Sequence, residues 1–259
     1  MSEVVIGPDN EVLDFRLHNY HENGWYFGAG DPEFWQLTDK LLKPGGRLLD
    51  IGMGEARASL FFALNGMAVV GVDINPKRIE AVKSMAEDLS AVMPFDMKAV
   101  ESDPFTQPLP EGKFDSVIIG QMVHIESKQK ALELFDKALD ALKPGGHIWI
   151  RAAGKESDAY DELSWYAAHP SQYEFEFVDA DVIEHPCICS GEWAIEPTLF
   201  FDPLDLHVYF ADRGCKVVHS QTIPTEGKMN IMYGEDYNPD NDIERGGMIT
   251  VLAQKPKQE

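Results

Sequence analysis

The stretch RLLDIGMGEARASL, from Arg47 to Leu60, decides the fold predicted for this chain. Its apolar run ends in an acid, Asp50, and Gly52 and Gly54 follow one residue apart. An alanine- and leucine-rich segment that predicts a helix comes next. A strand, a tight turn and the start of a helix follow one another in this way where a loop holds a ligand. The rest of the sequence has to indicate which ligand that is.

The composition of the chain limits its class. The 259 residues carry a formal net charge of −22, and only three of them are cysteine. No run reaches the length of about 18 apolar residues that a transmembrane helix needs, and the acidic amino-terminal residues lack the apolar segment of a signal peptide. Because phosphate binding relies on clustered Lys and Arg, the charge argues against a nucleic-acid partner. We therefore expect a cytoplasmic protein with no membrane partner that acts on a small molecule or a protein.

Segments that predict strands and helices alternate between Gly45 and Gly154. The predicted strands cover residues 47–52, 67–73, 97–103, 113–120 and 145–154, and the predicted helices cover 55–66, 75–90 and 127–142. The second helix has Asn75 at its cap position and Pro76 in its first turn, which is typical of a helix start. Such alternation indicates an α/β protein with a parallel sheet and helices on both faces.

The alternation breaks after Gly154. Residues 155–201 are aromatic, acidic and irregular, and the regular pattern then resumes with a helix at 202–214 and strands at 215–224 and 247–256, separated by a polar loop at 225–247. An irregular insertion of this length is usually functional. The expected organisation is an amino-terminal lid or helical segment (1–44), a core (45–154 and 202–259) and a cap insertion that covers the substrate (155–201).

Two common nucleotide loops do not match the opening stretch. A dinucleotide fingerprint needs a third glycine where Arg57 stands, and its absence disfavours a nucleotide-dependent oxidoreductase. A phosphate-binding loop of the Walker type would need Gly-Lys-Ser or Gly-Lys-Thr, which does not follow. The pattern is instead an acid, two glycines and a small residue, at Asp50, Gly52, Gly54 and Ala56.

This pattern resembles motif I of the class I S-adenosylmethionine (SAM)-dependent methyltransferases, with Ala56 where a glycine is often found. Further matches follow in register over roughly residues 42–154, and the core is similar to that of ubiquinone and menaquinone methyltransferases. The resemblance implies a seven-stranded Rossmann-like sheet, mostly parallel with the last strand antiparallel, and a cap insertion after strand 5. It also implies SAM as the methyl donor and S-adenosylhomocysteine (SAH) as the product.

The resemblance assigns the cofactor to three loops and the end of the fourth strand. The implied cofactor residues are Asp50, Gly52, Met53, Gly54, Asp73, Ile74, Ser102, Asp103, Pro104, Gln121 and Met122. An acid suits the cationic groups of SAM, and glycines allow the backbone to approach the ligand. Simpler roles stay open, because Asp50 and the glycines can serve only the turn, and Asp103 can serve ordinary turn chemistry before Pro104.

The acceptor side of the site is less defined. His124, after the fourth strand, is the candidate general base, although a structural histidine is an equal alternative. Trp25 and Tyr26 lie between glycines and are candidates for a lid, since ring faces attract a sulfonium. The insertion contributes three further candidates for contact with the acceptor, namely His185, Trp165 and Tyr166.

The sequence favours a methyltransferase acting on a small-molecule acceptor, with the methylated atom (O, N, C or S) and the oligomeric state left open. A protein or nucleic-acid methyltransferase is an alternative, although GQMVHI stands where an NPPY-type tetrapeptide is expected. A non-catalytic SAM-binding adaptor is another alternative. His185, Cys187 and Cys189 form H-x-C-x-C, but no paired C-x-x-C motif accompanies them, so we expect no metal site.

Overall fold

The computed structural model describes residues 32–54, 56–92, 94–120, 122–155, 176–179, 182–187, 194–229 and 243–257. The chain divides into two compact units. The first unit comprises Met1–Gly120, Asp140–Ile148 and Lys257–Glu259, and the second comprises Gln121–Leu139 and Trp149–Pro256. In the described part of the chain, no helix is both long and apolar enough to cross a bilayer.

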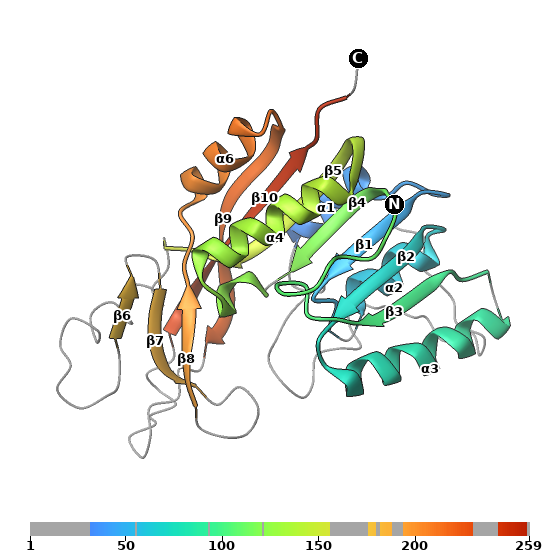
Figure 1. Cartoon of the computed structure of the whole chain (residues 1–259), viewed down its shortest axis with the longest axis horizontal. Coiled ribbons are helices and arrows are strands. Elements are labelled where there is room, and N and C mark those ends of the chain that lie inside the picture. Colours follow the sequence, from blue (N-terminus) through green and yellow to red (C-terminus); the bar gives the residue numbers. More distant parts are fainter. Residues whose placement is uncertain are drawn as a thin grey trace. The chain divides into compact units, whose positions relative to one another are not determined.

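The first unit is built from helices and strands that alternate as far as its third strand (Figure 1). Its elements are α1 (Pro32–Leu41), β1 (Arg47–Ile51), α2 (Arg57–Leu64), β2 (Ala68–Asp73), α3 (Pro76–Val92), β3 (Met97–Glu101), β4 (Phe114–Gly120) and the beginning of β5 (Leu142–Ala153). β1 is parallel to both β2 and β4, and β2 is parallel to β3. The carboxyl ends of these strands therefore lie at one edge, where ligands bind in open α/β sheets.

The second unit contains the remaining elements. They are η1 (Val123–Ile125), most of α4 (Lys128–Ala141), the end of β5, β6 (Glu176–Asp179), β7 (Val182–Cys187), β8 (Ala194–Leu199), α6 (Pro203–Asp212), β9 (Lys216–Met229) and β10 (Ile243–Gln254). The described strands form a seven-stranded sheet in the order β3-β2-β1-β4-β5-β10-β9. Since β10 is antiparallel to β9, the predicted Rossmann-like sheet with an antiparallel last strand is confirmed.

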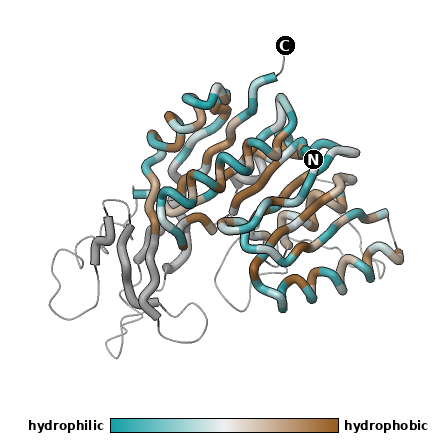
Figure 2. The backbone as a smooth tube through the Cα atoms, in the orientation of Figure 1, coloured by the Kyte–Doolittle hydropathy of each residue, from teal (hydrophilic) through white to brown (hydrophobic). Residues whose placement is uncertain are grey.

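Apolar side chains explain why the central strands of the first unit are buried on both faces. In β1, Leu48, Leu49 and Ile51 are fully buried, and in β4 the run Val117–Ile119 is fully buried as well. Continuous apolar runs of this kind are typical of parallel strands covered by helices. Figure 2 shows them as hydrophobic colouring along these strands.

The start of α3 follows the sequence signal. The Asn75 side-chain oxygen accepts hydrogen bonds from the backbone N–H groups of Lys77 (3.0 Å) and Arg78 (3.4 Å), and Pro76 is the first helical residue. These contacts satisfy donors that have no partner within the helix. The predicted cap is confirmed, and it places the residues before α3 at the end of β2.

Two segments expected to be irregular contain strands. Residues 176–199 include the antiparallel sheet β6-β7-β8, and the loop expected at 225–247 is shortened because β9 continues to Met229 and β10 begins at Ile243. The reason is that antiparallel pairing joins backbone groups, so polar side chains do not prevent it. β5 likewise begins at Leu142 rather than at 145.

Candidate functional site

The glycine loop, defined here as residues 52–54, is fixed to the neighbouring strand. The N–H groups of Gly52 and Met53 both donate to the Val72 carbonyl, at 2.8 and 2.9 Å. Gly52 and Gly54 have positive φ angles of 74° and 54°, which glycine adopts without steric cost. Open space surrounds the position that a Cβ of Gly54 would occupy, so a ligand can approach the backbone there.

Ala56 continues the loop in the same left-handed region, with φ 62° and ψ 27°. This conformation costs a residue with a Cβ about 1–2 kcal/mol relative to the right-handed form. This cost gives a physical reason why glycine is often found at this position in the methyltransferase family that the loop resembles. A bond of 2.9 Å from the Ala56 N–H to the Met53 carbonyl holds the turn in place.

Asp73, at the end of β2, joins the glycine loop to the start of α3. One carboxylate oxygen accepts from the Gly54 N–H at 2.9 Å, and the other accepts from the Asn75 N–H at 2.8 Å. Arg78 lies 4.0 Å from the same carboxylate, with about half of its side chain exposed. Ile74, the next residue, is 64% exposed. A buried acid beside an exposed apolar side chain suits a ribose next to a flat ring.

Asp50 lies on β1 and its carboxylate faces α2 rather than solvent. It is 4% exposed, and the buried Ser59 hydroxyl donates to it at 2.7 Å. Burial raises the pKa of Asp50 to about 6; the hydrogen bonds from Ser59 act in the opposite direction, and the charge of Asp73 adds to the increase. The site therefore holds two carboxyl groups, those of Asp50 and Asp73, close to the glycine loop.

The loop after β3 reaches the same edge of the sheet. The Ser102 N–H donates to the Asp73 carbonyl at 3.1 Å. The Asp103 carboxylate accepts from the Phe105 N–H (3.0 Å) and the Thr106 hydroxyl (2.7 Å), so it closes a local turn. Pro104 is buried. The turn role considered for Asp103 is thus observed, and its role toward adenine remains a prediction.

A glycine that the sequence analysis did not select also shapes the loop. A Cβ at Gly71 in β2 would overlap the sulfur of Met53 and lie 3.2 Å from its Cγ. Met53 itself is 6% exposed. The available signal was a glycine inside a predicted strand, which often marks a close approach of another segment.

The site thus combines two acids with a glycine loop that is not followed by a phosphate-binding Gly-Lys-Ser or Gly-Lys-Thr sequence. This arrangement suits a cationic ligand without phosphate. The sequence family described as "Methyltransferase domain" matches residues 49–150. Residues 49–150 are a SAM-dependent methyltransferase domain. The sheet order is that of class I, and the matched range contains the loop, Asp73 and the turn after β3.

Curated relatives resemble this methyltransferase domain over part of their length. The S-adenosyl-L-methionine-dependent Diels-Alderase iccD of Talaromyces variabilis is 33% identical over 141 residues, which is 48% of this chain and 47% of that protein. A ubiquinone biosynthesis O-methyltransferase of Xanthomonas campestris is 26% identical over 124 residues, 48% of this chain and 50% of that protein. The chain therefore spans about half the length of these curated relatives.

A solved structure extends the likeness in fold beyond the matched range. A SAM-dependent methyltransferase of Methanosarcina mazei superposes with a TM-score of 0.64 at 16% identity, over 86% of this chain and 98% of that one. At this identity the likeness concerns the fold alone. It agrees with the order of strands in the seven-stranded sheet.

The acceptor side of the methyltransferase domain is described only in part. Met122 precedes η1, His124 lies within η1 and His185 lies on β7, and the side chains of both histidines fall outside the description. The remaining predicted residues lie outside the described ranges altogether, namely Trp25, Tyr26, Gln121, Trp165 and Tyr166. Among the described residues, no cluster of three or more His, Cys, Asp or Glu side chains can hold a metal ion.

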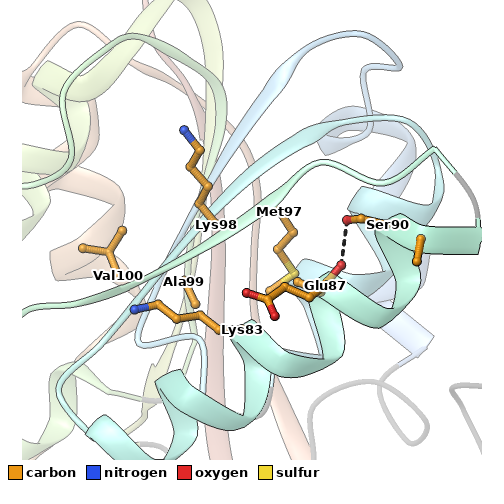
Figure 3. Close-up of a pocket in the computed structure, with 9 residues that line it drawn as sticks. Lys83, Glu87, Ser90, Met97, Lys98, Ala99 and Val100 are labelled. Atoms are coloured by element: carbon orange, nitrogen blue, oxygen red, sulfur yellow. Dashed lines mark hydrogen bonds between the residues drawn. The ribbon is translucent and has the colours of Figure 1, made fainter.

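A separate hollow lies between α3 and β3 (Figure 3). It has a volume of about 570 Å³, and its lining includes Lys83, Glu87, Met97 and Lys98. The dashed line in the figure is the Ser90 hydroxyl donating to a backbone carbonyl of α3. None of the predicted cofactor residues lines this hollow, which lies beside the outermost strand of the sheet.

Proposed function

We propose that the chain is an enzyme that transfers a methyl group from SAM to a small-molecule acceptor. The observation that carries this proposal is the bond from the Gly54 N–H to the Asp73 carboxylate, because it joins the glycine loop to the acid proposed to bind the ribose. The family match supports the cofactor, and the name of the ubiquinone biosynthesis relative supports a small acceptor. We also propose that the enzyme works in the cytoplasm and has neither a nucleic acid nor a membrane as its partner.

SAM supplies an activated methyl group on a sulfonium. In the proposed site, Gly52 and Gly54 allow the methionine portion to approach the backbone, Asp73 accepts from the ribose hydroxyls, and Ile74 packs on the adenine. Ser102, Asp103 and Pro104 border the adenine from the next loop, and Gln121 and Met122 border the cofactor from the end of β4. Since methyl transfer is a displacement at carbon, the chain contributes chiefly by positioning donor and acceptor.

Calorimetric titration with SAM, SAH and NAD in parallel tests the cofactor assignment. We expect SAM and SAH to bind and NAD to give no signal. Asp73→Ala is expected to weaken SAM binding at least tenfold, because the ribose loses its acceptor and Gly54 loses its tether. Asp88→Ala, an exposed acid on α3, is the matched control. Equal SAM binding by both variants contradicts the assignment.

His124 is proposed as the general base, and Trp25, Tyr26, Trp165, Tyr166 and His185 as the acceptor cover. With an acceptor found by screening for SAH formation, His124→Gln is expected to lower kcat by about 100-fold or more, as loss of a positioned base does. SAM affinity is expected to stay unchanged. A variant with normal kcat removes the base from the proposal but leaves the cofactor assignment intact.

The Diels-Alderase relative favours one second candidate function. A chain of this fold can bind SAM while catalysing a reaction other than methyl transfer, since fold does not determine function. The two candidates differ in one observable, the formation of SAH. Tight SAM binding without SAH formation across a broad acceptor panel supports the second candidate over the first.

A further inference from the structure

Ser59 and Asp50 form a buried pair that links β1 to α2. The Ser59 hydroxyl donates to the Asp50 carboxylate at 2.7 Å, and the Ser59 backbone N–H also favours the ionised form of this carboxylate. Ser59 is completely buried. The residue at the cap position of α2, Ala56, offers no side-chain hydrogen bond. Asp50 therefore places a carboxylate at the first turn of α2, where a negative charge is favoured by the helix dipole.

The surroundings of Asp50 contain no compensating cation among the described side chains. From β2, Asp50 is opposite Gly71, and the nearest charged group there is Asp73; from β4 it is opposite the apolar Ile118. The hydroxyl and the N–H of Ser59 are the groups that favour its ionised form. Burial and Asp73 both act against ionisation.

We propose that Ser59 is a positioning residue for the cofactor, whose hydroxyl bond orients the buried Asp50 carboxylate beside the glycine loop so that the site prefers cationic SAM over SAH. The inference rests on SAM binding at this loop. SAM carries a sulfonium that SAH lacks, and a buried charge such as that of Asp50 is screened less than an exposed one. Methyl transfer leaves the electron pair on sulfur, so the attraction disappears in the product and its release is favoured.

The preference for SAM over SAH is expected to weaken as the pH falls. A bound cation favours the ionised Asp50, so the Kd for SAM is flat above about pH 6 and rises below it, by up to about tenfold per pH unit. The Kd for SAH rises less, because the sulfonium is absent. The preference for SAM, expressed as the Kd for SAH divided by the Kd for SAM, therefore falls toward acid pH.

Calorimetric titration of the full chain with SAM and with SAH, over a pH range on both sides of 6, tests the inference. In Ser59→Ala, the carboxylate loses one bond that favours ionisation, so the midpoint of the SAM curve is expected to move to higher pH. Ser59→Thr keeps the hydroxyl and is expected to retain the midpoint. In Asp50→Asn, the Kd for SAH divided by the Kd for SAM is expected to be low and independent of pH.

The outcomes separate this inference from the proposed function. A pH-independent ratio in the natural protein, with SAM still bound, overturns the inference and leaves the proposed function standing. Absence of SAM binding at every pH overturns the proposed function itself. If Ser59→Ala raises the Kd equally at all pH values, Ser59 has only a structural role. Thermal unfolding of each variant checks that it is folded, and Asp50→Asn gives an independent test if Ser59→Ala is not.

Discussion

At the scale of single residues, Gly71 fixes the place of Met53 in the glycine loop. Because a Cβ at Gly71 would overlap the Met53 sulfur, Gly71→Ala must displace Met53. We expect a loss of about 1–3 kcal/mol in the free energy of unfolding, as for other overpacked sites, and about tenfold weaker SAM binding. Chemical denaturation and calorimetry measure the two effects.

The control for this prediction is the double variant Gly71→Ala/Met53→Ala. If the overlap causes the defect, Gly71→Ala is expected to cost little in a chain that already lacks the Met53 side chain, so the two substitutions are not additive. Full additivity shows that Gly71 acts through something other than Met53.

Asp50 supplies a second prediction at this scale. Its folded-state pKa, about 6, lies above its ordinary value of 3.8. Its contribution to stability is therefore present below pH 3.8 and lost as the pH rises through 6. At neutral pH we expect Asp50→Asn to raise the free energy of unfolding by up to about 3 kcal/mol, so that the variant unfolds at a higher denaturant concentration than the natural protein. The difference should vanish in acid; a difference independent of pH contradicts the assignment.

The individual residues of the loop were predictable because their chemistry is local. Gly52 and Gly54 occupy positive φ angles, and Asp73 ends β2 within reach of Gly54. The roles of Ser59 and Gly71 depend on contacts between elements, which spacing along the chain does not encode. The turn at Asp103 was predictable, in contrast, because the Asp103 carboxylate bonds to a residue only two positions along the chain.

At the scale of elements, a clamp joins α4 to α6 within the second unit. Asp136 on α4 accepts two hydrogen bonds from Arg213 (2.5 and 3.1 Å) and one from the Tyr209 hydroxyl (2.7 Å). The Arg213 guanidinium also lies 3.6 Å from the centre of the Tyr209 ring. The Arg213 bonds lower the pKa of Asp136, so the clamp stabilises above the ordinary carboxyl pKa and is lost as pH falls through the lowered value.

Tyr209→Phe tests this clamp. The single hydroxyl proton is shared between the Asp136 carboxylate and the Leu132 carbonyl, which lies 2.9 Å from the hydroxyl oxygen. Removal of the hydroxyl is therefore expected to cost about 1 kcal/mol in the free energy of unfolding. Asp136→Asn is expected to cost a similar or smaller amount, because half of the Asp136 side chain is exposed and solvent screens the ion pair. Asp140→Ala, at an exposed acid on α4, is the control. The prediction fails if Tyr209→Phe unfolds at the same denaturant concentration as the natural protein.

The ends of the elements show what sequence patterns encode. The start of α3 was predictable because Asn75 and Pro76 act within one turn. The extra length of β9 and β10 was not, because it comes from pairing between strands, such as Met229 with Ile243. The three strands within residues 176–199 were missed for the same reason.

At the scale of the whole molecule, the formal net charge of −22 affects how ligands reach the site. A field of one sign raises the association rate of an oppositely charged ligand, and salt screens this effect beyond roughly 10 Å. SAM carries a net positive charge near neutral pH, whereas SAH has no net charge. The two ligands therefore form a matched pair of nearly equal size.

Stopped-flow measurement of both association rate constants at low and high ionic strength tests this effect. As the ionic strength rises, we expect the association rate constant for SAM to fall by up to about tenfold, which is the smallest effect typical of electrostatic steering. The association rate constant for SAH is expected to stay nearly unchanged. The dissociation rate constants should change less, because salt screens the approach more than the buried contacts. The charge of Asp50 is one among 44 acidic residues, so Asp50→Asn is expected to leave the salt dependence of SAM association intact while it lowers affinity. An equal salt dependence for both ligands would show that the field of the whole molecule does not reach the site, and that discrimination between SAM and SAH arises only after contact.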